Sequence, residues 1–234
     1  MSLVHLSQFN YQIHFSASVG EDFLKSILEM LNNDNLDLGL GATLIKCETG
    51  SGSCIDFFAD SVCELVDVPI NYNNVVFLMR DLNKQNNILY KKFNRGFFYI
   101  DLKDVVVIDS STFVCVNHRC VENINIGGNF VFNYPFSRAS ESAFFSPELL
   151  SLEKIPAEVN YKCFYYSLGA LGIYLLFGKK LDSRREGEGK GVKVGVGVGV
   201  GVEKIVGSIC NTKLYWALLK CVSVDCERRD LLFI

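Results

Sequence analysis

Asp101 and Lys103 are the residues whose types and spacing first indicate chemistry. They end the stretch Phe97-Phe98-Tyr99-Ile100-Asp101-Leu102-Lys103, which runs directly into the apolar segment Val105-Val106-Val107-Ile108. A carboxylate and an ammonium two residues apart, on a short loop at the mouth of a β-branched strand, are suited to phosphoryl-transfer chemistry. A polar turn, Asp-Leu-Lys-Asp, that joins two buried segments explains the same residues, and this simpler interpretation stays open.

The composition indicates a folded, mildly acidic chain that can bury a large core. Its 234 residues are 49% hydrophobic and 12% aromatic, which excludes wholesale disorder and allows one large domain or two small lobes. The net charge is −3 and no basic stripe stands out, so we expect no nucleic-acid partner. The apolar run from Cys163 to Gly178 is too short for a membrane span and predicts a buried helix, so we expect no membrane association.

Cysteine and histidine usage argues against a structural metal. The nine cysteines contain no Cys-x-x-Cys pair, and the three histidines are scattered, so the clustered ligands of a zinc site are missing. The N-terminus has no basic flank followed by an apolar segment, so we expect no secretory leader. The cysteines are therefore expected to be reduced, and the protein cytoplasmic.

The elements before the Asp-Leu-Lys loop are predicted from hydrophobic periodicity. Apolar residues alternate in the first 20 positions and then recur at helical spacing from Glu21. In order, we expect a strand or hairpin in 1–20, a helix in 21–31, strands in 36–48, a flexible linker in 49–53, and helices in 55–65 and 75–94.

The elements after the loop alternate between buried and polar segments. Residues 184–202 are of low complexity, with glycine and valine alternating at the end, and predict an exposed and disordered insert. The other expected elements are a strand pair in 105–108 and 113–116, a long loop in 127–143, a segment opened by Ser146-Pro147-Glu148, and helices in 161–177 and 213–219.

Four of these pieces, followed by a fifth near the end of the sequence, stand in an informative order. The Asp-Leu-Lys loop and the strand pair are followed by Ser146-Pro147-Glu148, by Tyr166-Ser167-Leu168-Gly169 on a buried helix, and by a terminal Cys226-Glu227-Arg228-Arg229. The order resembles the C-terminal lobe of eukaryotic-type protein kinases, over roughly residues 42 to 234. That family has His-Arg-Asp-Leu-Lys, Asp-Phe-Gly, Ala-Pro-Glu, Trp-Ser-Leu-Gly and a late arginine that pairs with the Ala-Pro-Glu glutamate. The abbreviated form and Thr212-Lys213-Leu214-Tyr215-Trp216 look most like Ser/Thr kinase-like proteins of large DNA viruses.

The resemblance implies the fold class and the division of the chain. We expect an α+β protein with a protein kinase-like fold, in which a reduced N-terminal β lobe occupies residues 1–48. Residues 49–234 would then form a mainly α-helical C-terminal lobe that carries the low-complexity insert at 184–202.

The resemblance also implies roles for single residues. Asp101 falls at the position of the catalytic base, and Lys103 at that of the lysine that contacts the transferred phosphoryl group. Glu148 and Arg229 would form a structural ion pair. The segment Lys46-Cys47-Glu48 would lie at the hinge that holds adenine.

A second register stays open for the N-terminal part. In it Lys46 would be the counterpart of the lysine in the family's Val-Ala-Ile-Lys strand, and Glu64 would be its partner on a helix. That register would leave no room for the hinge before the helix in 75–94.

Several family motifs are missing from the sequence. No Gly-x-Gly-x-x-Gly precedes a strand, and Tyr99 and Ile100 replace the histidine and arginine of the catalytic loop. Asn117 stands where the family has its metal-binding aspartate, and Asp104 is the nearest substitute for the metal-binding asparagine. Phe164 replaces an aspartate that braces the catalytic loop. Loss of these groups removes most of the electrostatic stabilisation that phosphoryl transfer needs.

Three hypotheses follow. The first is a degenerate kinase, or pseudokinase, that binds a protein partner through its C-terminal lobe, including the aromatic loop from Phe130 to Phe145, with Asp101 and Lys103 kept as a salt-bridged loop. The second is an active, divergent Ser/Thr protein kinase that acts on a protein substrate with ATP and Mg²⁺, with Asp104 and Asn117 as metal ligands. The third is an unrelated α+β protein in which the order of motifs arises by chance.

Overall fold

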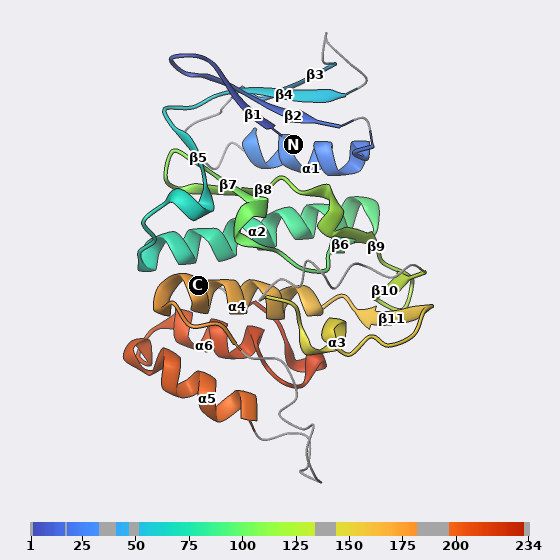
Figure 1. Cartoon of the computed structure of the whole chain (residues 1–234), viewed down its shortest axis with the longest axis vertical. Helices are drawn as coiled ribbons and strands as arrows, with labels where there is room; N and C mark the ends of the chain where they lie inside the picture. Colours follow the sequence, from blue (N-terminus) through green and yellow to red (C-terminus); the bar gives the residue numbers. More distant parts are fainter. Residues whose placement is uncertain are drawn as a thin grey trace.

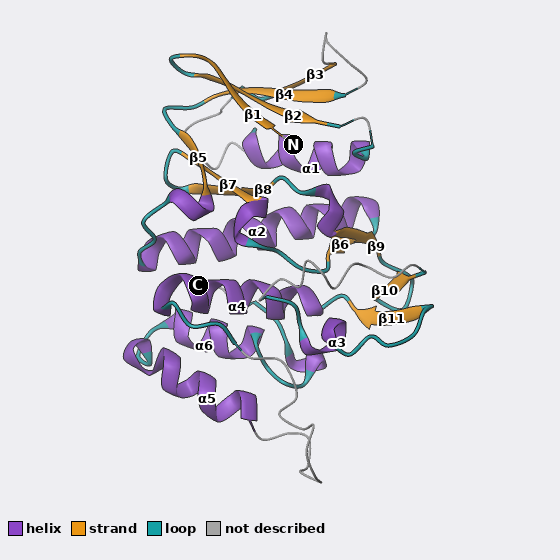
Figure 2. Ribbon diagram, viewed as in Figure 1, coloured by secondary structure: helices purple, strands orange, loops and turns teal. Residues whose placement is uncertain are grey.

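A computed structural model describes residues 2–16, 18–32, 41–46, 52–133, 144–181 and 197–231. In Figure 1 the elements form a stack, with an antiparallel sheet at one end, a helical part at the other and a small sheet with a long helix between them. Figure 2 shows the same division by type, with most of the strands in the upper half and helices dominating the lower half. The described chain is therefore an α+β structure.

The N-terminal sheet has four antiparallel strands in the order β1-β2-β4-β3. These are β1 (Ser2–Ser7), β2 (Asn10–Phe15), β3 (Thr43–Lys46) and β4 (Ser53–Phe58). Alternate residues of β2 point inward and are buried, as expected for a strand with one solvated face. Helix α1 (Glu21–Leu31) packs against that inner face through buried apolar residues at helical spacing.

The helix expected in 55–65 is wrong. The chain instead forms β4, then β5 (Val62–Glu64) and a 3₁₀ turn, Leu65–Asp67. Ile55 and Phe57 are fully buried against α1 while Asp56 pairs with Gln12 of β2, a two-residue period that the short apolar run had concealed. The N-terminal sheet therefore extends to Phe58, beyond the boundary expected at residue 48.

The middle layer is built on α2 (Tyr72–Phe93), which begins with a reciprocal capping box between Asn71 and Asn74. A three-stranded antiparallel sheet, in the order β5-β7-β8, lies on this helix. Its hairpin consists of β7 (Val105–Ile108) and β8 (Thr112–Cys115), close to the predicted strand pair. A second small pair joins β6 (Arg95–Phe97) to β9 (Val121–Asn123).

The helical part is centred on α4 (Cys163–Phe177), whose residues from Cys163 to Ile173 are all buried. Helix α6 (Lys213–Cys221) packs across α4, and α3 (Pro147–Leu150) lies near its beginning (Figure 1). The strands β10 (Asn129–Phe132) and β11 (Ala157–Asn160) pair antiparallel, although the sequence predicted a loop over the first of them. No helix in the described ranges is both long and apolar enough to span a bilayer.

Part of the low-complexity segment is ordered. Residues 184–196 lie outside the described part of the chain, but Gly197–Val206 form helix α5. Val202 and Val206, one helical turn apart, are buried in the main core, so the expectation of an exposed insert is wrong for this end. Regarding the cysteines, seven of the described residues are free thiols, as expected, whereas Cys54 is disulfide-bonded.

Candidate functional site

The Asp-Leu-Lys loop lies between β6 and β7, and buried polar residues of α2 fix the strands around it. The Asn86 side-chain oxygen accepts a hydrogen bond from the backbone N–H of Phe97 at 2.9 Å, at the end of β6. The Gln85 amide accepts from the Cys115 N–H at 2.9 Å and donates to the Cys115 carbonyl at 3.0 Å. Asp81 accepts from the Phe113 N–H at 3.1 Å. Helix α2 thus fixes the position of β6, which precedes the loop, and of β8, which follows it.

Ser167 of α4 anchors the loop through two hydrogen bonds. Its hydroxyl accepts from the Ile100 N–H at 2.9 Å and donates to the Ile100 carbonyl at 3.2 Å. Both groups are buried, so the hydroxyl satisfies a donor and an acceptor that would otherwise lack partners. Phe164, at the position where the resemblance implied a bracing aspartate, packs its ring 5.9 Å from that of Phe97. The polar contact between α4 and the loop is made by Ser167, about one helical turn further along α4.

Asp104 and Asn117, the expected metal ligands, lie together but point toward one another. The Asn117 amide donates to Asp104 Oδ1 at 2.8 Å, and the Asp101 N–H donates to Asp104 Oδ2 at 3.2 Å. The remaining Asn117 oxygen accepts from the Arg119 N–H at 3.0 Å. Asp104 is only 3% exposed, and burial raises the pKa of its carboxyl to about 6. Through these hydrogen bonds, the Asp104 and Asn117 oxygens hold the loop against the end of β8.

Asp101 and Lys103 are placed at the surface of the same loop. Asp101 is half-buried and Lys103 is exposed on the 3₁₀ turn Leu102–Asp104. In the described part of the chain no ion pair joins Asp101 to Lys103, so the expectation of a salt-bridged loop is wrong. The two residues are two positions apart, a spacing at which side chains diverge on a helical turn.

Tyr99, which the resemblance aligned with a catalytic-loop histidine, is part of an aromatic cluster. Its ring lies 4.7 Å from that of Phe145 and 4.9 Å from that of Phe98, measured between ring centroids. Burial, reinforced by the nearby Asp104 carboxylate, raises the pKa of the Tyr99 hydroxyl well above its ordinary value. Tyr99 therefore stays neutral and supports the loop by packing.

The connection between the sheet and the helical part follows β4 and is held by Asp109. This residue sits at the tip of the β7–β8 hairpin with φ of 51°, and its Oδ1 accepts from the N–H groups of Asp60 and Ser61 at 2.8 and 2.9 Å. The Asp109 N–H donates in turn to the Ser61 carbonyl at 2.9 Å, while the Ala59 N–H donates to the Phe9 carbonyl at 2.9 Å. All three consecutive backbone donors of this connection are thus engaged within the protein.

This topology corrects the expected position of the hinge. Lys46 is the last residue of β3, which pairs antiparallel with β4, so the chain returns to the N-terminal sheet after it. Cys47 and Glu48 lie outside the described residues. The alternative register is also wrong, because Glu64 is the exposed last residue of β5 and not part of a helix.

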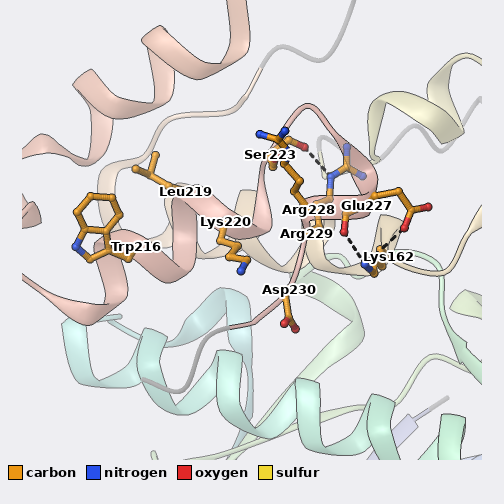
Figure 3. A pocket seen from close by; sticks show the side chains of 9 residues that line it. All are labelled: Lys162, Trp216, Leu219, Lys220, Ser223, Glu227, Arg228, Arg229 and Asp230. Atoms are coloured by element: carbon orange, nitrogen blue, oxygen red, sulfur yellow. Dashed lines mark hydrogen bonds and ion pairs between the residues drawn. The ribbon is translucent and has the colours of Figure 1, made fainter.

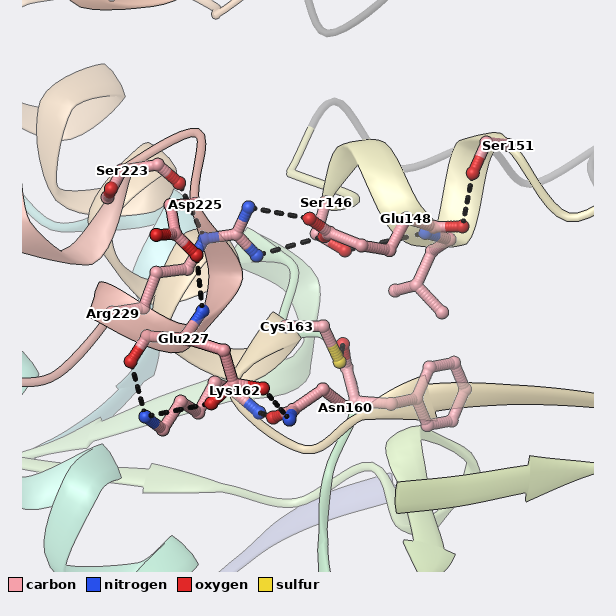
Figure 4. A network of polar contacts seen from close by, with 12 residues as sticks. Ser146, Glu148, Ser151, Asn160, Lys162, Cys163, Ser223, Asp225, Glu227 and Arg229 are labelled. Atoms are coloured by element: carbon pink, nitrogen blue, oxygen red, sulfur yellow. Dashed lines mark hydrogen bonds and ion pairs between the residues drawn. The ribbon is translucent and has the colours of Figure 1, made fainter. Parts of the chain in front are cut away.

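Glu148 and Arg229 contact one another directly (Figure 4). Arg229 Nη1 donates to Glu148 Oε2 at 2.9 Å and Nη2 to Oε1 at 2.8 Å, and Arg229 Nε donates to the Ser223 carbonyl at 2.7 Å. The guanidinium carbon also lies 5.0 Å from the centre of the Tyr166 ring. Burial alone would raise the pKa of Glu148, but hydrogen bonds and charge from Arg229 outweigh it and lower that pKa. The pair connects α3 to the segment that follows α6.

The aromatic segment from Phe130 to Phe145 does not offer its described rings to solvent. Phe130, Phe132, Phe144 and Phe145 are each at most 3% exposed. Phe130, Phe132 and Phe145 join Phe98 in a second core cluster beside α3. The described aromatic residues of this segment therefore stabilise the fold, and the expectation that they form a display surface is wrong; residues 134–143 lie outside the described part.

Comparison with known proteins identifies the fold. No family model matches the sequence, and no curated protein matches it. Among solved structures, the kinase PK-1 of Cydia pomonella granulovirus is similar, with a TM-score of 0.54 and 11% sequence identity. The match covers 96% of this chain and 82% of the viral chain. The chain has a protein kinase-like fold. At this identity the similarity extends to the fold, and the roles of the individual site residues have to be argued from their own geometry.

The residues of this kinase-like protein fit a magnesium ion poorly. Mg²⁺ needs oxygen ligands free to point at one centre in octahedral geometry. The Asp104 carboxylate oxygens and the Asn117 amide oxygen are each already hydrogen-bonded, and Asp104 is buried. Within the described ranges, no group of three or more His, Cys, Asp or Glu side chains is arranged to hold a metal ion.

Sequence reasoning missed the residues that brace the loop. Asp81, Gln85 and Asn86 place polar groups on a face of α2 that is otherwise apolar, and Ser167 does the same on α4. Buried polar side chains on a core-facing stripe are a signal in themselves, because each needs a specific partner. The sequence, however, contains nothing that names those partners, since they are backbone groups more than ten residues away.

Proposed function

We propose that this kinase-like protein is a pseudokinase, which acts by binding another protein and has weak or no phosphotransfer activity. The observation that carries the proposal is the contact between Asp104 and Asn117. The two side chains that could replace the family's metal ligands are hydrogen-bonded to each other and closed in by backbone donors. A metal ion would have to break this network.

The connection between the two parts of the chain supports the same proposal. In the family that the fold resembles, this connection is the hinge that holds adenine. Here its consecutive N–H groups at Ala59, Asp60 and Ser61 already donate to Phe9 and Asp109. An adenine base would gain a hydrogen bond from these donors only where one of the existing bonds is lost, so the net gain would be small.

A divergent, active Ser/Thr kinase is the second candidate, and one observation favours it. Lys103 is exposed and Asp101 half-buried on one loop, and the two are not joined to each other, so both side chains remain accessible to a substrate. In this candidate Asp101 acts as the base and Lys103 contacts the phosphoryl group, with ATP and Mg²⁺ supplied from solution.

Nucleotide binding and phosphate transfer separate the two candidates. Thermal unfolding of the whole chain is measured with ATP, ADP and buffer alone, each with Mg²⁺ or Mn²⁺, and transfer of labelled phosphate to the chain and to mixed protein substrates is followed in parallel. A ligand at a hundredfold its dissociation constant would add about 2.7 kcal/mol to the free energy of unfolding. We expect no saturable shift and no transfer. Metal-dependent incorporation of phosphate that disappears in Asp101→Ala would overturn the proposal and establish the active kinase.

A further inference from the structure

A shallow, open pocket of about 510 Å³ lies on the helical part of the protein, and none of the residues that line it belongs to the Asp-Leu-Lys loop (Figure 3). Its walls come from α6, from the segment after α6 that ends at Asp230, and from Lys162 just before α4. In Figure 3, Trp216 and Leu219 occupy one end of the pocket, Lys162 and Glu227 the other, and Lys220 lies between them.

The apolar end of the pocket contains an exposed aromatic side chain, Trp216, that is not buried in the hydrophobic core. Trp216 is 59% exposed and is the single tryptophan of the sequence. The opposite face of α6 is already packed, because Leu214, Ala217 and Leu218 are fully buried. Tryptophan is enriched among residues that dominate protein–protein binding energies, and an exposed one beside a hollow is typical of an interaction site.

The charges around the pocket are mostly compensated. Lys162 Nζ lies 3.7 Å from Glu227 Oε2 and donates to the Glu227 carbonyl at 2.6 Å. Arg228 pairs with Asp225 at 3.0 Å, and Arg229 with Glu148. Of the charged side chains that line the pocket within the described ranges, only Lys220 and Asp230 have no hydrogen bond or ion pair.

The spacing along α6 combines the apolar surface with the uncompensated cation. Trp216, Leu219 and Lys220 stand at positions i, i+3 and i+4, which places them on one face of the helix. Asp230 is the remaining uncompensated charge, on the segment that follows. The pocket thus presents an apolar surface, a positive charge and a negative charge within one hollow.

We propose that this pocket binds a peptide segment of a protein partner in which an apolar side chain is followed by an acidic and then by a basic residue. The apolar side chain packs on Trp216 and Leu219, the acid pairs with Lys220, and the base pairs with Asp230. The inference rests on the proposed function, because it names the surface through which a pseudokinase of this fold would act. It commits to a complementary peptide, because the pocket's two uncompensated charges are of opposite sign.

Selection from a displayed library of random twelve-residue peptides, with the whole chain as bait, tests the proposal. We expect enrichment of sequences in which Leu, Ile or Phe precedes Asp or Glu and then Lys or Arg. Trp216→Ala should weaken binding of the enriched peptides at least tenfold. Lys220→Glu should shift the selected position from acidic to basic, and Asp230→Lys should remove the preference for the following base.

The single tryptophan provides a direct readout. Titration of an enriched peptide without Trp or Tyr should change the emission of Trp216 saturably, and the change should weaken as salt is added. The same peptide with Gln for Glu and Asn for Asp should bind at least tenfold more weakly. Lys213→Glu is the matched control, since it makes the same charge change on α6 at an exposed residue outside the pocket. Circular dichroism should give closely similar helix content for all variants, because the substituted residues are exposed.

Three outcomes overturn the proposal. The first is enrichment of peptides that lack the charge pattern. The second is peptide enrichment that Trp216→Ala and Lys220→Glu leave unchanged. The third is self-association of the protein that Trp216→Ala abolishes, which would make a second copy the occupant. Each leaves the absence of phosphotransfer untouched. Conversely, metal-dependent phosphotransfer would overturn the proposed function without any change in peptide selection, so the two failures are distinguishable.

Discussion

Arg229 and Glu148 are joined by two parallel hydrogen bonds, of 2.9 and 2.8 Å, although 81 positions separate them in the sequence. The Arg229 side chain is fully buried, and its third donor reaches the Ser223 carbonyl at 2.7 Å. A buried guanidinium that loses one of its hydrogen-bond acceptors is strongly destabilising, so the stability of the fold depends on each of these bonds.

Glu148→Ala should therefore lower the free energy of unfolding by about 3–5 kcal/mol, because it leaves a buried charge without its partner. The double variant Glu148→Leu with Arg229→Met should cost less than the sum of its single changes, since it removes the charge together with the carboxylate. Urea denaturation of the parent protein, of Glu148→Ala, of the single variants Glu148→Leu and Arg229→Met, and of the double variant measures both quantities. A loss below about 1 kcal/mol for Glu148→Ala would mean that the pair contributes no more than an exposed ion pair.

Ser167→Ala should destabilise the protein by about 1–3 kcal/mol, because the Ile100 N–H and carbonyl would both be buried without a partner. Ser26→Ala is the matched control. Ser26 is equally buried, but its hydroxyl donates to the Phe23 carbonyl within its own helix and accepts only a long, 3.5 Å hydrogen bond from Gln85 Nε2, so its loss should cost less. Amide hydrogen exchange should increase at Ile100 in the first variant only. Equal exchange in both variants would show that the hydroxyl does not hold the loop.

Asp104 should make the protein less stable as the pH rises from about 4 to 6. Burial raises the pKa of the native carboxyl to about 6, against an ordinary value of 3.8, so the native state binds more protons than the unfolded state within this window. The penalty is complete above the native pKa and absent below the unfolded one. It amounts to about 2–3 kcal/mol at roughly 1.4 kcal/mol per pKa unit.

Asp104→Asn isolates this effect, because the amide does not titrate. The difference in unfolding free energy between the variant and the parent protein should change by about 2 kcal/mol between pH 4 and 7, in favour of the variant at the higher pH. Chemical denaturation at several pH values measures it. A difference that stays constant with pH would contradict the raised pKa.

Gly169 marks a close approach between α4 and α6. A Cβ at this position would lie 2.6 Å from Cys221 Cβ and 2.8 Å from Val222 Cγ1, so Gly169→Ala should separate the two helices and cost about 1–3 kcal/mol or more. Gly201→Ala is the control in α5, where a Cβ would meet nothing within 4 Å. That change should stabilise the protein by about 0.5–1 kcal/mol. Melting temperatures that shift in the same direction would contradict the packing of α6 on α4.

The elements with long and regular patterns were predictable from the sequence. Helix α2 and helix α4 begin within three residues of their expected starts, and the β7–β8 hairpin occupies the predicted strand pair to within one residue. Each carries an uninterrupted apolar pattern long enough to distinguish a helical period from a strand period. The fold class followed from the order of these elements and the motifs between them.

The incorrect predictions concern segments whose hydrophobic pattern is short and residues whose partners are distant in the sequence. Ile55 and Phe57 lie in an apolar run of only a few residues, which fits a helix or a strand equally well until β2 and β3 are placed beside it. The alternation of Gly and Val concealed the helical face formed by Val202 and Val206. At the site, Asp104 and Asn117 lie next to each other, but their mutual hydrogen bond depends on side-chain direction, which no spacing rule supplies.

Asp109 has a mechanical consequence for the two halves of the molecule. Domain closure in proteins relies on a few connecting residues whose backbone torsions are free to change. Here the Asp109 carboxylate, at a hairpin tip, accepts hydrogen bonds from the N–H groups of Asp60 and Ser61 in the connecting segment, and the Asp109 N–H donates to the Ser61 carbonyl. A change in the backbone torsions of Asp60 and Ser61 would break these three hydrogen bonds at once, so this part of the connection resists bending.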